Sequence, residues 1–109
     1  MSSEELLDAL RELELQMRGA ETMQFVHQQP AEARMQFAAD LTILSTCIGK
    51  IENAQLSEIA GRLSALDGDL KEGIKNLQES LDDIGQATAV LKEIGTLTGL
   101  AAKVAGLAL

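Results

Sequence analysis

Apolar residues recur at steps of three or four positions along almost the whole chain, and this spacing places them on one face of an α-helix. The longest such series starts at Leu56 and continues to Leu91. A half-buried strand needs alternation with a period of two, which is sustained nowhere in the sequence. The chain is therefore predicted to be all-α. It is expected to fold as a helical hairpin or an up-and-down helical bundle with one long, heptad-patterned, coiled-coil-like helix.

Length and composition indicate one small domain. The chain has 109 residues, of which 46% are hydrophobic, and its only aromatic residues are Phe25 and Phe37. A core without Trp or Tyr must be built mainly from Leu, Ile, Ala and Met, as is typical of helical proteins. We therefore predict a single helical domain over residues 1–109.

Two helices are predicted before the long series. Ser2 and Glu5 have the spacing of a capping box, which favours a helix start in the first three residues. Pro30 has no amide hydrogen and disfavours helical backbone at the residue before it, so it ends the first helix and fits the first turn of the next. The expected helices span residues 1–29 and 30–54.

The long helix is predicted over residues 55–93, with two alternatives at residues 67–69. Asp-Gly is a turn dipeptide, so a break at Gly68 would give helices of ordinary length. The apolar series, however, crosses this point without interruption. A continuous helix would be about 60 Å long at about 1.5 Å per residue, which is too long for a compact domain of this size to shelter. Such a rod would need a partner.

The apolar series is a candidate surface for self-association, and we call its members the interaction seam. A straight helix would carry more apolar positions than one short chain buries against itself, so the seam predicts homo-oligomers or binding of a helical protein partner. The seam consists of Leu56, Ile59, Leu63, Leu66, Leu70, Ile74, Leu77, Leu81, Ile84 and Leu91.

Residues 94–109 form a nearly uncharged C-terminal segment, in which Lys103 is the single charge. Gly95 and Gly99 have the G-x-x-x-G spacing, which lets two helices approach closely. The segment is predicted to be an amphipathic helix that packs closely against another helix or contacts a membrane. The residues expected to do so are Ile94, Gly95, Leu97, Gly99, Leu100, Ala101, Val104, Gly106 and Leu107.

Charge and the N-terminal sequence bear on partners and location. The net charge of −8 makes a phosphate-binding surface improbable, so no nucleic-acid partner is expected. The acidic N-terminus lacks the positive region of a cleavable signal peptide. The protein is therefore expected to be cytoplasmic by default, while signal-independent secretion and membrane association stay open.

Residues that could perform catalysis are sparse. His27 is the only histidine, at an expected helix end, where capping explains it better than catalysis. Cys47 is the only cysteine and lies among apolar residues, as a buried structural thiol does. We therefore expect no enzyme activity, no catalytic residues, no metal site and no cofactor.

Three functions follow from this pattern. The first is a non-enzymatic helical interaction protein that self-assembles through the interaction seam and the C-terminal helix. The second is a membrane-active protein, either pore-forming or membrane-associated, that inserts its C-terminal segment. The third is a small acidic adaptor or chaperone that holds a partner helix in a Met-rich groove.

Overall fold

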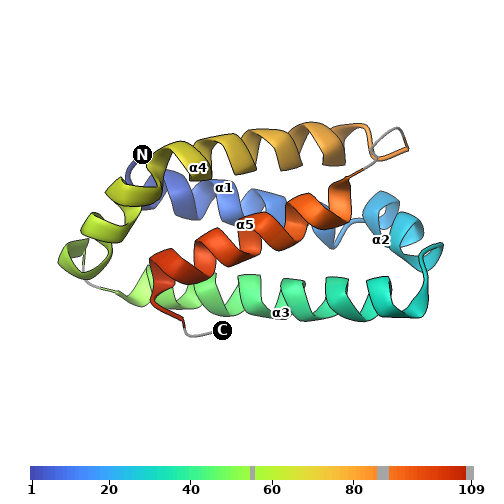
Figure 1. The fold of residues 1–109 in the computed structure, drawn as a ribbon, viewed down its shortest axis with the longest axis horizontal. Helices are drawn as coiled ribbons and strands as arrows, with labels where there is room; N and C mark the ends of the chain where they lie inside the picture. Colours follow the sequence, from blue (N-terminus) through green and yellow to red (C-terminus); the bar gives the residue numbers. More distant parts are fainter. Residues whose placement is uncertain (55, 86–88, 108–109) are drawn as a thin grey trace.

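The chain is an all-α helical bundle, as the sequence predicts. The computed structural model describes residues 1–54, 56–85 and 89–107, and these residues contain no strand. The helices are α1 (Ser3–Met17), α2 (Ala20–His27), α3 (Ala31–Asn53), α4 (Leu56–Asp82) and α5 (Val90–Ala105) (Figure 1). The long helices α1, α3, α4 and α5 form the bundle, and the short α2 lies at one end of it (Figure 1).

The helices are arranged as two parallel pairs. α1 packs beside α3 and α4, and α5 packs beside the same two helices. In Figure 1, α1 and α4 run in one direction while α3 and α5 run in the other, and α4 begins next to the end of α3 before it crosses to the opposite side of the bundle. The bundle therefore has an α1/α4 side and an α3/α5 side.

One continuous core lies between the helices. The buried residues of α1 show how the sequence period produces it, since Leu6, Leu10, Leu13 and Met17 follow each other at steps of four, three and four. All four are fully buried and belong to the same hydrophobic cluster as the buried residues of α3, α4 and α5. Each long helix thus contributes one apolar face to a shared core.

The first helix begins as expected. Ser2 accepts a hydrogen bond from the Glu5 backbone N–H at 3.1 Å, and the Glu5 carboxylate accepts one from the Ser2 backbone N–H at 3.4 Å. The predicted capping box is therefore present.

The prediction of one helix over residues 1–29 is wrong, because α1 ends at Met17 and a second helix, α2, begins after Gly19. Gly19 has an extended backbone, with φ −71° and ψ 162°, and starts α2. A Cβ added there would lie 3.1 Å from the Gln16 carbonyl oxygen, so a glycine suits this close approach. The Thr22 hydroxyl donates a hydrogen bond to the same carbonyl at 3.0 Å and ties α2 to the end of α1. The break lets Thr22 and Val26 turn inward, where both are buried.

The two alternatives at residues 67–69 resolve in favour of a helix, because α4 is continuous through Gly68. The long helix nevertheless ends at Asp82 rather than at residue 93, and α5 begins at Val90 rather than at residue 94. The 27 residues of α4 span about 40 Å. This length matches the 42 Å long axis of the molecule, whereas the longer rod would project beyond the core.

Candidate interaction surface

The structure places the interaction seam inside the bundle, where α4 packs against α1 and α5. Five seam residues on α4 are buried: Ile59, Leu63, Leu70, Leu77 and Leu81. Leu66 and Ile74 on α4, Ile84 just after the end of α4, and Leu91 on α5 are partly buried and pack against the same core. The side chain of Leu56 lies outside the described part of the chain. One chain therefore buries most of the seam by itself, and assembly through the seam would require the bundle to open.

Most of the C-terminal segment belongs to α5, which is one of the long helices of the bundle. Ile94, Leu97, Ala101 and Val104 are buried in the core. Leu100 and Leu107 are partly buried against it. Gly106 ends α5 with a left-handed backbone, φ 73°, and its N–H donates to the carbonyls of Ala102 and Lys103. The apolar face that predicted membrane contact is thus packed against α3 and α4.

The predicted G-x-x-x-G pair does not form a close helix crossing within the chain. A Cβ added to Gly99 would meet nothing within 4 Å, and one added to Gly95 would lie 3.7 Å from the Asp40 carboxylate. Gly73 of α4 also faces a neighbouring helix, because its added Cβ would lie 3.6 Å from Leu97 and from Leu100 of α5. Sequence reasoning missed Gly73, although it lies between the seam residues Leu70 and Ile74.

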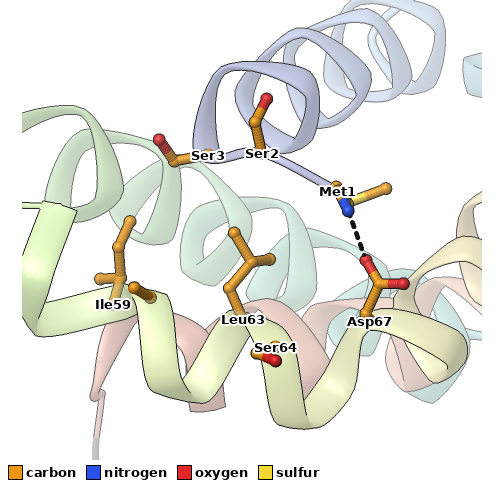
Figure 2. A pocket seen from close by; sticks show the side chains of 8 residues that line it. Met1, Ser2, Ser3, Ile59, Leu63, Ser64 and Asp67 are labelled. Atoms are coloured by element: carbon orange, nitrogen blue, oxygen red, sulfur yellow. Dashed lines mark hydrogen bonds and ion pairs between the residues drawn. The ribbon is translucent and has the colours of Figure 1, made fainter.

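A cavity of about 500 Å³ lies between the start of α1 and the first half of α4. Figure 2 shows Leu63 pointing from α4 toward the N-terminal residues, with Asp67 reaching the amino group of Met1. That ion pair spans 2.7 Å. The Met1 ammonium, followed by the hydrogen bond from Lys71, lowers the pKa of the Asp67 carboxyl. The residues that line the cavity include three serines but neither a histidine nor a cysteine.

The two isolated reactive side chains lie apart from this cavity. His27 is the last residue of α2 and is exposed. Cys47 is fully buried in the core, and this burial raises the pKa of its thiol despite the opposing charge of Lys50. Among the described residues, no three His, Cys, Asp or Glu side chains come together in a way that could hold a metal ion.

Within residues 1–54, 56–85 and 89–107, none of the helices combines the length and the apolar character that crossing a bilayer requires.

Charge divides the molecule into two unlike sides. α1 and α4 together carry eleven acidic and four basic residues, whereas α3 and α5 carry four of each. Most of the net charge of −8 therefore lies on the α1/α4 side. The α3/α5 side is close to neutral, and Lys92 and Lys103 are exposed on α5.

The outward surface of α3 is unusual because it carries no charge for most of its length. We call it the outer face of α3, and it consists of Met35, Ala38, Ala39, Thr42, Thr46 and Gly49. Only Gly49 among them is partly buried, and Met35 is 72% exposed. A solvent-facing helix surface normally carries charged and polar residues. This uncharged surface is therefore the candidate site for a partner.

Sequence reasoning missed the outer face of α3 although its signal is present. Between Arg34 and Lys50 the one charged residue is Asp40, and the structure shows Asp40 on the buried side of the helix, 6% exposed. Its carboxylate accepts a hydrogen bond from the Gln36 side chain at 3.0 Å. With Asp40 turned inward, nothing charged remains on the outer face.

Comparison with protein-family models, with curated proteins and with solved structures gives no significant match to this chain.

Proposed function

We propose that this chain is a non-enzymatic helical protein that self-associates as a folded bundle through its α3/α5 side. The observation that carries the proposal is the charge distribution, with eleven acidic and four basic residues on α1 and α4 against four of each on α3 and α5. It supports self-association on this side because the outer face of α3 is the uncharged part of that surface.

Electrostatics decides which side two copies would present to each other. Charges are screened over about 8 Å at physiological ionic strength, so the charges near the contact matter most. Two α1/α4 sides brought together would set one acidic surface against another. Two α3/α5 sides carry little net charge, so they would repel each other little. Burial of the uncharged outer face of α3 would also remove few charged groups from water.

Self-association of folded bundles differs from assembly through the interaction seam. The core residues Leu70 and Leu77 are fully buried and would keep their partners within each chain. Association through α3 requires no opening, so it costs none of the core packing.

The membrane-active and adaptor functions would use other parts of the molecule. Insertion of the C-terminal segment would remove Ile94, Leu97 and Val104 from the core. A Met-rich groove would need its methionines together, yet Met17 is buried in the core and Met35 is exposed on α3. Neither function is favoured by an observed surface.

Sedimentation equilibrium of the wild-type chain tests the proposal. We expect a reversible monomer–dimer equilibrium at concentrations between about 10 μM and about 1 mM, as suits a small interface. A chain that stays monomeric throughout this range contradicts the proposal. Flotation of the chain with vesicles of phosphatidylcholine and phosphatidylserine, without self-association, overturns it in favour of a membrane function.

A further inference from the structure

We infer that the outer face of α3 binds the same face of a second copy around a two-fold axis near Thr42, with the two α3 helices antiparallel. This inference rests on the proposed function and specifies its interface. We choose a second copy as the partner because each flank of the outer face carries one acidic and one basic residue, which can pair with the same two residues of another copy.

The chemistry of the outer face suits close contact between helices. Thr42 and Thr46 donate their hydroxyl hydrogens to backbone carbonyls one turn earlier, both at 3.0 Å. Ala38 and Ala39 add small apolar side chains to the same exposed face. Small side chains of this kind let two helix backbones approach, and Met35 adds an exposed, adaptable apolar side chain at one end.

Two pairs of opposite charges flank this face. Glu32 and Lys50 are 18 residues apart, which is five helical turns, so they lie on one flank about 27 Å from each other. Arg34 and Glu52 have the same separation on the other flank. The ion pair of Glu52 with Arg11, 3.0 Å, shows that this second flank lies toward α1.

An antiparallel two-fold arrangement brings each flank against the same flank of the other copy. Glu32 then lies opposite Lys50 of the second copy, and Arg34 lies opposite Glu52 of the second copy. The midpoints of the two pairs fall one residue on either side of Thr42. The charges on both flanks are therefore compatible with one two-fold axis near Thr42. The arrangement places four intermolecular ion pairs, two on each flank, around the uncharged contact.

A lipid surface fits the outer face less well than a second copy does. Helices that lie on membranes use Trp, Phe or Leu on the apolar side and several Lys or Arg beside them. The outer face of α3 offers Met35 as its single large apolar side chain, and its flanks carry as many acidic as basic residues. One helix face also buries less than the roughly 800 Å² per partner of a standard interface, so the dimer is expected to be weak and reversible.

Charge reversal with rescue tests the arrangement. E32K and K50E each replace two attractive contacts by two repulsive ones, and we expect each to weaken the dimer about 10-fold or more in sedimentation equilibrium. The double variant E32K/K50E should recover the wild-type dissociation constant within about threefold, because the pairs are restored with their signs exchanged. An equimolar mixture of E32K and K50E should form a heterodimer in preference to either homodimer.

Matched variants on the α1/α4 side control for the change in net charge. Glu79 and Lys75 are exposed on α4, so E79K and K75E make the same charge changes away from the proposed interface. We expect neither to weaken the dimer as its α3 counterpart does. All these side chains are exposed, and thermal melting by circular dichroism should show each variant folded.

The outcomes separate this inference from the proposed function. A wild-type chain that dimerises but responds equally to E32K and E79K keeps the proposed function and overturns the α3 interface. Rescue of E32K by R34E instead of K50E overturns the antiparallel arrangement, because a parallel pair sets Glu32 against Arg34. A wild-type chain without self-association overturns both.

Discussion

The hydroxyl of Thr42 donates a hydrogen bond to the carbonyl oxygen of Ala38 at 3.0 Å, one turn back along α3. Thr46 makes the same bond to the carbonyl of Thr42. The hydroxyl hydrogens at the centre of the outer face are thus bonded within their own helix. Neither hydroxyl therefore needs a second copy as the acceptor of its hydrogen.

Replacing Thr42 by valine should leave both folding and association intact. Valine keeps the shape and removes only a hydroxyl that no second copy needs, so the free energy of unfolding should change by less than about 0.5 kcal/mol. The dimer should be at least as stable as that of the wild type. T42D, in contrast, should weaken the dimer strongly because it places two like charges on the axis. Equal dimerisation of the two variants in sedimentation equilibrium would show that residue 42 is outside the interface.

The seam variants L77D and L81D should unfold the bundle rather than dissociate an oligomer. The two leucines are 0% and 2% exposed, and a buried unpaired carboxylate costs several kcal/mol, comparable with the whole stability of a small domain. We expect loss of helical circular dichroism in the double variant. Leu15, 74% exposed on α1, provides the control, since L15D should stay folded. A helical, monomeric double variant would instead support assembly through the seam.

Glycines in α4 and at the end of α5 should respond in opposite ways to alanine. Added Cβ atoms at Gly61 and Gly68 meet nothing within 4 Å, so G61A and G68A should each stabilise the helix by about 0.5 to 1 kcal/mol. Gly106 has φ 73°, where alanine is strained, so G106A should destabilise the bundle by about 1 kcal/mol or more. Thermal melting should show the two shifts with opposite signs. A loss of stability in G61A would mean that Gly61 has a contact absent from the monomer.

Asp67 should contribute to the acid sensitivity of the fold. Its pKa is lowered by the Met1 ammonium and by Lys71, so it lies below the value of about 3.9 in the unfolded chain. The stabilising contribution is then complete above about pH 5 and is lost as the pH falls through the folded-state pKa. D67N should melt with a shallower dependence on pH below about pH 5 than the wild type. Identical pH profiles would mean that this ion pair contributes nothing to stability in solution.

The fold was predictable where the sequence pattern is local. The capping box at Ser2 and Glu5 and the helical period of the core residues determine the helices, and both are read directly from the residues. The break at Gly19 was less accessible, because the apolar period continues through it and only the close approach to Gln16 makes a glycine favourable there. A local pattern identifies a helix more readily than the point at which tertiary packing interrupts it.

The candidate site depended on three-dimensional information. The period of the interaction seam is the same whether Leu77 packs against its own chain or against a second copy, so the sequence leaves that choice open. In the structure α1 and α5 of the same chain pack against α4. The sequence shows that Asp40 belongs to α3, but only the structure shows that its side chain lies on the inner side of the helix and leaves the outer face of α3 uncharged.

Covalent capture at the proposed axis tests self-association through α3 most directly. The wild-type Cys47 is buried, so C47A provides a background without thiols, in which T42C adds one thiol at the axis and A65C adds one on the exposed surface of α4. A bis-maleimide with a reach of about 8 to 10 Å, the distance between packed helix axes, should link T42C chains into dimers and leave A65C chains monomeric. Equal cross-linking of both variants, or linkage of A65C alone, would contradict association through the outer face of α3.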